Sequence, residues 1–364
     1  MAVFFGADFY NLPLDSDRDL FIQRTNQIFD YMRRHLPDHK FVYQPHPNET
    51  DESKHLDLEG FKIGRHVVAE MYLHENADSI DYVFSAQSGA SISAFAMGFD
   101  SVIFLDLLSG ALSADSILGY RSYFSELPDS FFIKSFDDPL PRRKHINVED
   151  ERGSLVKVRE ALDLNKTTWV IASDPYSGFR GAVLVSNLKK ENPNLRAKLI
   201  IINHRRWDLG RDSEFMKSSF DEIITLPGGR VWYGVGFKKL LATVRVARFI
   251  KRLPLQPGDN LISFANALFE ENCFLSYHPR VNKIAMINSR MYKFIYDGGY
   301  ESLPDGGWSG SLGVWFFSYL LEPLLGLYRT IYKEYDDGKV LNLFRYTLPL
   351  EDIYDKIFVL KPSV

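Results

Sequence analysis

Residues 81–98 read DYVFSAQSGASISAFAMG, in which an apolar run ending at Phe84 gives way to hydroxyl and glycine residues and then to a small-residue stretch. The first run has the length and composition of a buried strand, and the stretch from Ala90 to Gly98 favours a helix. The next apolar run, SVIFLDLL at 101–108, predicts another strand. A strand, a helix and a strand in this order are typical of a parallel sheet covered on both faces.

The same alternation extends over the rest of the chain. Upstream, the runs at 2–7 and 40–44 predict strands, and the periodic stretches at 19–36 and 65–75 predict helices. Downstream, we expect strands at 167–173, 198–204, 221–226, 260–266 and 293–297, and helices at 180–191 and about 233–251. The segment 134–153 carries charge clusters, two prolines and no periodicity, so it predicts a linker.

Two such arrays predict an α/β chain with two Rossmann-like domains, 1–150 and 151–364. The chain has 364 residues, of which 45% are hydrophobic, which is enough for two cores. We expect the domains to face one another across a cleft, because sheets of this kind bind ligands at the carboxyl ends of their strands. Functional residues are therefore expected directly after strands.

The composition limits the partners and the cellular compartment. Lys and Arg total 43 against 47 Asp and Glu, a net charge of −4, so no global charge favours nucleic acid as a partner. The single cysteine, Cys273, excludes a disulfide within the chain and fits a cytoplasmic protein. The nine histidines lack the spacing of metal ligands, so we expect no bound metal. The first residues predict a strand rather than a signal peptide.

The first candidate site follows the expected strand 40–44, where the chain reads Pro45-His46-Pro47-Asn48-Glu49. Pro47 restricts the backbone of His46 to extended conformations and so stiffens the loop. A histidine held at the carboxyl end of a strand can donate to a phosphate and stabilise a departing nucleotide. The alternative is a turn histidine bonded to nearby backbone.

The second candidate site is the junction between the expected strand and helix within 81–98, which contains Ser85, Ser88, Gly89 and Ser91. Hydroxyls and backbone N–H groups at the start of a helix can bind an anion, and Gly89 would let a phosphate approach the backbone closely. The alternative is an ordinary serine cap.

The two segments together resemble the paired motifs of bacterial sialyltransferases and related capsule and lipooligosaccharide transferases that use CMP-activated sugars. In those families a His-Pro dipeptide is followed by a Ser-Ser or Ser-Thr pair that opens a small-residue helix; here Ser88 and Gly89 stand at the pair position. The resemblance implies that His46, Pro47 and Ser88, with Ser85 and Ser91, bind the CMP phosphate. It also implies a glycosyltransferase-B (GT-B) fold with no cofactor.

The order of the halves differs from that of the family. There the nucleotide-binding domain comes last, whereas the matching motifs here lie in the first half. The second half resembles the acceptor domain, whose signature is two acids and a glycine after a strand: Asp297-Gly298 match the second acid and the glycine, and Tyr296 replaces the first acid. The closing stretch 342–362 resembles the end of that domain. The resemblance therefore implies a circularly permuted chain.

Asp297 is also a candidate on chemical grounds. A carboxylate at the end of a strand, followed by two glycines, can accept the proton of a sugar hydroxyl. An Asp-Gly pair is equally common in turns. Asp336-Asp337-Gly338 is the rival, although it follows a charged helical stretch and is interpreted as a surface turn.

Several other segments stay open to two interpretations. The stretch 174–180 and His204-Arg205-Arg206 follow strands and could line the site or belong to ordinary turns. His278-Pro279 lacks a serine-rich partner. Lys238, Arg245, Arg248 and Arg252 form one stripe on the helix near 233–251, which suits either solvent or peripheral contact with an anionic membrane. The apolar stretch 311–328 is interrupted by Glu322-Pro323, and we expect a buried or surface-associated helix pair there.

Three functions compete on this sequence. The leading hypothesis is an inverting, metal-independent transferase that moves a sialic acid or Kdo-like sugar from a CMP donor to an oligosaccharide or glycolipid acceptor of a bacterial surface glycan. The second keeps the fold and uses a nucleotide-diphosphosugar, as a transferase or a sugar epimerase. The third is a non-catalytic glycan- or nucleotide-binding protein.

Overall fold

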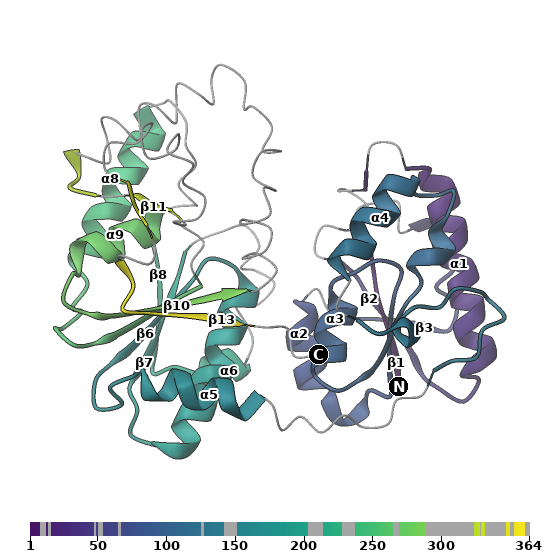
Figure 1. Cartoon of the computed structure of the whole chain (residues 1–364), viewed down its shortest axis with the longest axis horizontal. Helices are drawn as coiled ribbons and strands as arrows, with labels where there is room; N and C mark the ends of the chain where they lie inside the picture. The colour runs from purple at the N-terminus through teal and green to yellow at the C-terminus, as the bar shows by residue number, and fades with distance from the viewer. Residues whose placement is uncertain are drawn as a thin grey trace. The chain divides into compact units, whose positions relative to one another are not determined.

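The computed structural model divides the chain into two compact units, Met1–Glu151 with Pro362–Val364, and Arg152–Lys361 (Figure 1). Each unit is an α/β array of its own. The structure describes residues 1–7, 12–13, 16–46, 49, 54–64, 67–124, 127–141, 151–202, 214–227, 237–264, 269–288, 324–327, 329–331, 347–349 and 353–360.

The first unit is built on a five-stranded parallel sheet of order β3-β2-β1-β4-β5. The strands are β1 (Ala2–Phe5), β2 (Phe41–Gln44), β3 (Phe61–Ile63), β4 (Tyr82–Ser85) and β5 (Asp100–Ile103). The helices are α1 (Arg18–His35), α2 (Ala69–Glu75), α3 (Ala90–Ala96) and α4 (Ala114–Tyr123), with 3₁₀ turns η3 (Ala77–Ser79), η4 (Leu105–Leu108) and η5 (Asp129–Phe131).

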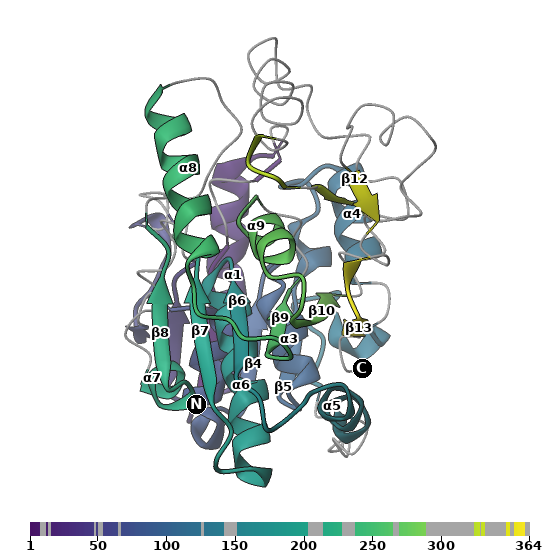
Figure 2. The same ribbon diagram turned by 90° about the vertical axis from the view of Figure 1, so that its left-hand side faces the viewer.

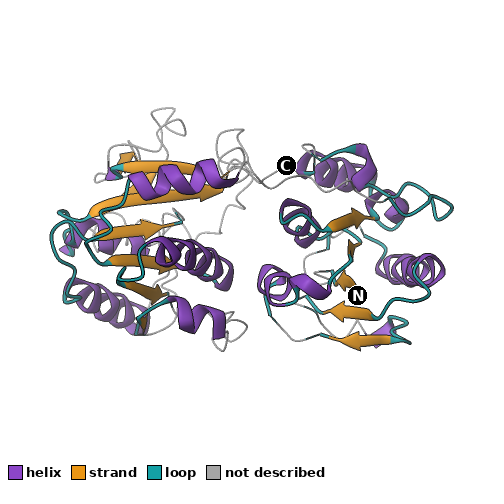
Figure 3. Cartoon of the chain, turned by 90° about the horizontal axis from the view of Figure 1, so that it is seen from below, coloured by secondary structure: helices purple, strands orange, loops and turns teal. Residues whose placement is uncertain are grey.

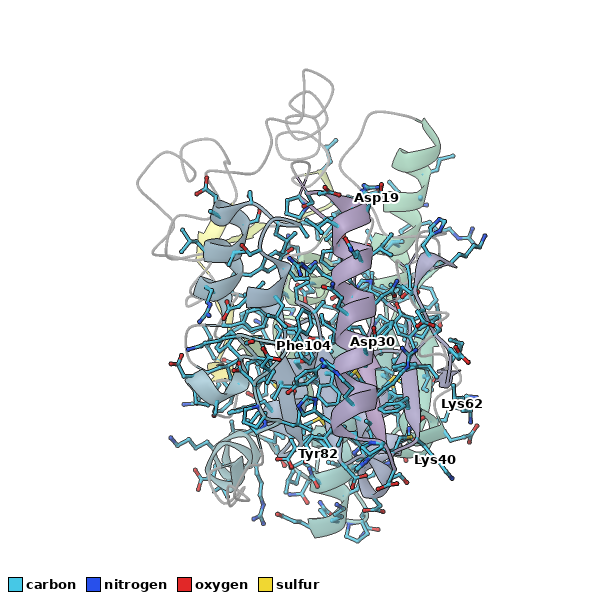
Figure 4. All side chains as sticks on the ribbon, turned by 90° about the vertical axis from the view of Figure 1, so that its right-hand side faces the viewer. Asp19, Asp30, Lys40, Lys62, Tyr82 and Phe104 are labelled. Atoms are coloured by element: carbon cyan, nitrogen blue, oxygen red, sulfur yellow. The ribbon has the colours of Figure 1, made fainter. Side chains whose placement is uncertain are left out.

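Strand β1 shows why its sequence is apolar without alternation. Ala2 and Phe4 pack in one hydrophobic cluster with α1, and Val3 and Phe5 pack in another with α2 and α3. Because both faces of the sheet are covered, every side chain of the strand is buried. On the α1 face, Phe4 meets Phe29 edge to face with ring centroids 4.9 Å apart. The polar side of α1, with Asp19 and Asp30, faces outward in Figure 4.

The second unit contains a six-stranded parallel sheet of order β13-β10-β9-β6-β7-β8. Figure 2 shows these strands side by side. They are β6 (Thr168–Ala172), β7 (Ala197–Ile201), β8 (Glu222–Thr225), β9 (Asn260–Ser263), β10 (Asn282–Asn288) and β13 (Lys356–Leu360). The helices are α5 (Glu151–Glu160), α6 (Pro175–Glu191), α7 (Glu214–Ser219), α8 (Phe237–Lys251) and α9 (Phe269–Tyr277), and β11 (Arg329–Ile331) pairs with β12 (Thr347–Pro349).

Both sheets share one strand order around their first strand. In each unit the second and third strands lie on one side of the first, and the fourth and fifth lie on the other. The order reverses between β1 and β4 in the first unit and between β6 and β9 in the second. Helices cover both faces of each sheet (Figure 3). Sheets of this topology bind ligands outside the carboxyl ends of the strands at such a reversal, so each unit has one expected ligand-binding edge.

The α/β class and the two Rossmann-like arrays are confirmed, and several elements differ from the expectation. The run 101–108 is not one strand: β5 ends at Ile103, and Leu105–Leu108 form a 3₁₀ turn. Part of the expected linker belongs to the first unit, since the Tyr31 hydroxyl of α1 donates to Asp138 O at 3.0 Å. The expected strand 293–297 lies outside the described residues, as does most of 311–328. No helix in the described part of the chain has the length and apolar character needed to cross a membrane.

Close packing of α6 on β6 requires a glycine. A Cβ at Gly181 would lie 2.6 Å from Val170 Cγ1, well inside van der Waals contact. We expect Gly181→Ala to destabilise the second unit by about 1–3 kcal/mol, because the core must shift to admit one methyl group. Chemical denaturation followed by circular dichroism measures this loss.

Gly119 on α4 provides the matched control. It has no heavy atom within 4 Å of an added Cβ, so Gly119→Ala should be neutral or should stabilise by up to about 1 kcal/mol through helix propensity. Equal effects of the two substitutions would contradict the packing explanation.

Candidate functional site

The candidate site of the first unit lies at the carboxyl ends of three neighbouring strands. In the register of the sheet, Phe5 of β1 stands between Gln44 of β2 and Ser85 of β4. His46 follows β2 by two residues and Ser88 follows β4 by three, so the two candidate residues flank the end of β1. With strands about 4.8 Å apart, the loops that carry them start about 10 Å from each other. The expected placement of His46 and Ser88 at one sheet edge is confirmed.

Glu49 forms hydrogen bonds with two residues at the end of β2. Its carboxylate accepts hydrogen bonds from the His46 backbone N–H at 2.9 Å and from the Tyr43 hydroxyl at 2.8 Å, and the Glu49 N–H donates to His46 O at 2.9 Å. Gly6, directly after β1, packs against this arrangement: a Cβ there would lie 2.6 Å from both Glu49 Oε2 and the Tyr43 hydroxyl. His46 and Glu49 are therefore held by their mutual hydrogen bonds and by the close approach of Gly6.

Tyr43 remains a hydrogen-bond donor in this arrangement. Its ring is almost fully buried in β2. Burial first, and then the charge of Glu49, raises the pKa of the Tyr43 hydroxyl above its usual range. The phenol therefore stays protonated, and its proton is held by the carboxylate that positions His46.

A hydrogen bond between two buried serines stabilises the loop after β4. Ser85 and Ser91 are both fully buried, and their hydroxyl oxygens lie 2.7 Å apart. The Ser85 hydroxyl also accepts from the Ser88 N–H at 3.2 Å. In this structure Ser85 and Ser91 support the loop from within, so a direct contact with a ligand would require one hydroxyl to give up its partner. Their role in binding a donor stays a prediction.

Ser88 and Gly89 stand at the start of α3. The Ser88 hydroxyl accepts from the Ala90 N–H at 3.2 Å, whereas the N-cap position itself is occupied by Gly89, which makes no side-chain cap bond. Gly89 has φ −58° and ψ −18°, a conformation open to any residue, so the backbone does not require glycine here. What glycine does provide at this position is the absence of a side chain at the end of β4.

Gln87, in the same loop, was not singled out from the sequence. Its Oε1 atom is buried and has no hydrogen-bond partner among the described residues. A buried amide oxygen without a donor is costly, and a bound ligand is one explanation for it. Its position three residues before the helix gives no sequence signal, because the burial of one atom depends on the folded loop.

The corresponding edge of the second unit is the more acidic of the two in its described residues. At the end of β6, Asp174 caps α6: its carboxylate accepts from the Ser177 N–H at 2.8 Å, and the Ser177 hydroxyl accepts from the Asp174 N–H at 3.2 Å. After β9, α9 begins with Glu270 and Glu271, each only 2% exposed. Three carboxylates therefore belong to this edge, and they disfavour a phosphate there.

Glu270 and Glu271 were not among the residues predicted from the sequence. An acidic pair shortly after an apolar strand was a usable signal, but the helix that carries it, α9, was not predicted. The stretch FEENCFLSY at 269–277 lacks a clear helical stripe, because its polar and apolar side chains alike are buried in the protein.

The remaining candidates divide into two groups. Pro47, Asp297, Asp336, Asp337 and 204–206 lie outside the described residues. His278 has a structural role: its Nε2 lies 2.9 Å from Ile250 O, and burial lowers its pKa, so the neutral ring links α9 to α8.

Glu49 gives a direct test of how the His46 loop is held. We expect Glu49→Ala to cost about 1–3 kcal/mol of stability, because it leaves the buried Tyr43 hydroxyl without its acceptor. Glu49→Gln retains an acceptor oxygen and should cost much less. Thermal denaturation of both variants measures the difference, and equal losses would rule out the proposed anchoring.

Comparison with known proteins adds little to this geometry. No family model matches the chain, and no curated protein matches it. Among solved structures the chain is similar to the Escherichia coli ADP-heptose lps heptosyltransferase II, with 10% identity over 79% of this chain and 85% of that chain. The TM-score is 0.19, so this likeness carries no argument about arrangement or function.

Proposed function

We propose that this chain is a glycosyltransferase that moves a sialic acid or Kdo-like sugar from a CMP-activated donor to an oligosaccharide or glycolipid of a bacterial surface glycan. The donor phosphate binds at the carboxyl edge of the first unit. The acceptor hydroxyl is deprotonated by a carboxylate of the second. Where the acceptor is anchored in a membrane, peripheral contact with that membrane is part of the proposal.

The chemistry of this step is a displacement at the anomeric carbon. The acceptor oxygen forms the new glycosidic bond as the bond from the anomeric carbon to the phosphate oxygen breaks, and CMP leaves with the bonding electrons. Asp297 takes the proton of the acceptor hydroxyl. His46 and Ser88 donate to the phosphate and stabilise its growing charge, so no metal is required, and attack opposite the leaving group inverts the anomeric carbon.

The contrast between the two equivalent sheet edges is the observation that carries the proposal. At the first edge the described carboxylates are both engaged: Glu49 accepts from two donors, and Asp106 after β5 pairs with Arg121. Ser88 and Gly89 lie beside the end of β1. The second edge carries Asp174, Glu270 and Glu271. A phosphate is favoured at the first edge, and a proton acceptor is favoured at the second.

A nucleotide screen tests the proposal. A ligand that binds only the folded protein stabilises it by about 2.7 kcal/mol at a concentration of 100 Kd, and so raises the melting temperature. We expect CMP to raise it more than UDP, GDP or ADP, and EDTA to leave the shift unchanged. A preference for UDP would favour the alternative, a nucleotide-diphosphosugar transferase or epimerase, over the CMP-dependent enzyme.

Substitutions of Ser88 distinguish donor binding from a purely structural role of its hydroxyl. If Ser88 donates to the phosphate, Ser88→Ala should weaken CMP binding in calorimetry, and Ser88→Thr should retain it. Unchanged affinity in Ser88→Ala would leave Ser88 with only its structural hydrogen bond to the Ala90 N–H. Tight CMP binding without transfer to any glycan acceptor would favour the third hypothesis, a non-catalytic binding protein.

A further inference from the structure

Helix α8 has one buried and one exposed face. Thr243, Val246, Ala247 and Ile250 are at most 2% exposed and pack into the core of the second unit. Leu241 and Phe249 are 53% and 36% exposed. Figure 2 shows α8 standing beside α9. Two contacts hold the helix there. The His278 ring lies against Ile250 O, and the Lys251 ammonium lies 5.4 Å from the centroid of the Tyr277 ring, within the usual cation–π range of about 6 Å.

The exposed face combines these two apolar side chains with arginines. At 100° per residue, Leu241, Arg245, Arg248 and Phe249 fall within an arc of about 100°. Arg245 and Arg248 are exposed, as is Arg252 directly after the helix, and none of the three forms an ion pair with any described residue. We call Leu241, Arg245, Arg248, Phe249 and Arg252 the α8 stripe.

All charged side chains of this segment are basic. Residues 237–252 read FKKLLATVRVARFIKR, with six basic and no acidic side chains, in a chain whose net charge is −4. A solvated helix face would normally mix the two signs. Basic side chains interleaved with exposed leucine and phenylalanine are the composition of helices that lie at the surface of anionic membranes.

We propose that the α8 stripe is a docking surface for a bilayer of anionic phospholipids. Arg245, Arg248 and Arg252 contact lipid phosphates, and Leu241 and Phe249 enter the boundary between headgroups and acyl chains. Because the opposite face of α8 is buried in the protein core, the helix docks shallowly with its exposed face and stays folded on α9. The inference assigns a surface to the peripheral membrane contact of the proposed function and rests on it in this respect. Its test needs neither the donor nor the reaction, so it can fail while the proposed sugar transfer stands.

Vesicle sedimentation with the full chain tests this inference. We expect binding to vesicles of phosphatidylcholine with 30% phosphatidylglycerol, about a tenth of that binding or less to pure phosphatidylcholine, and weakening of the binding by salt. Binding to neither vesicle, as for a surface that takes a protein partner, would overturn the proposal. So would equal binding to both.

Three double variants locate the surface. Arg245→Gln with Arg248→Gln should weaken binding roughly 25-fold, at about fivefold per arginine. Leu241→Gln with Phe249→Gln should weaken it at constant charge. Lys40→Gln with Lys62→Gln removes the same charge from exposed positions of the first unit, labelled in Figure 4, and should leave binding within about twofold. An equal loss in this control, or none in the arginine variant, would overturn the assignment to α8.

Discussion

His46→Ala should lower the rate of sugar transfer by about 100-fold to 1,000-fold while the protein keeps its fold. That loss corresponds to one electrostatic contact to the leaving phosphate, about 2.7–4 kcal/mol in the transition state. The folding effect should be smaller than the loss of rate, because the hydrogen bonds between the His46 backbone and Glu49 do not involve the substituted side chain. Steady-state kinetics and thermal denaturation measure the two effects separately.

A second histidine in the same unit serves as the control. His55 is exposed, so His55→Ala should leave both transfer and stability unchanged. His46→Asn, which retains a donor, should recover part of the lost rate. A near-native rate in His46→Ala would remove His46 from the site and leave it as a turn residue.

Asp297→Asn should abolish turnover while CMP binding survives. The substitution keeps the size of the side chain and removes the proton acceptor, and general base catalysis contributes about 100-fold to 10,000-fold. Single-turnover kinetics gives the rate of the chemical step, and calorimetry gives the affinity for CMP.

Four further variants decide which carboxylate is the base. Asp336→Asn and Asp337→Asn should have mild effects. Glu270→Gln and Glu271→Gln are included because both carboxylates are buried at the ligand-binding edge of the second unit. If Asp337→Asn or either glutamine variant abolishes transfer while Asp297→Asn does not, Asp297 is not the base.

Much of the fold could be predicted from the sequence, because buried parallel strands are continuous apolar runs. The runs at 2–7, 40–44 and 167–173 predicted β1, β2 and β6 within two residues. The short edge strand β3 was missed, since two of its three residues are exposed and the signal is weak. β13 was also missed, although KIFVL is an apolar run; its pairing with β10, about 70 residues earlier, is a contact that no local pattern encodes.

The candidate site could be predicted from the sequence only in part. Strand-end placement put His46 and Ser88 at one sheet edge, because parallel strands bring their carboxyl ends together. The pairing of Ser85 with Ser91 and the two-donor arrangement at Glu49 depend on side-chain geometry in the folded loops, which residue types alone do not determine. The contrast between the two edges required the strand order of both sheets.

The strand order also determines when each sheet can be completed during synthesis on the ribosome. The first sheet is complete once the ribosome has passed Ile133, whereas the second waits for β13, the last strand to be made. At 5–20 residues per second this interval is roughly 10–45 s. Within it, β10 ends at Asn288 and β13 begins only at Lys356, so β10 presents an unpaired edge to other nascent chains for roughly 3–14 s. This makes the second unit, and not the first, the part that depends on protection from aggregation during translation.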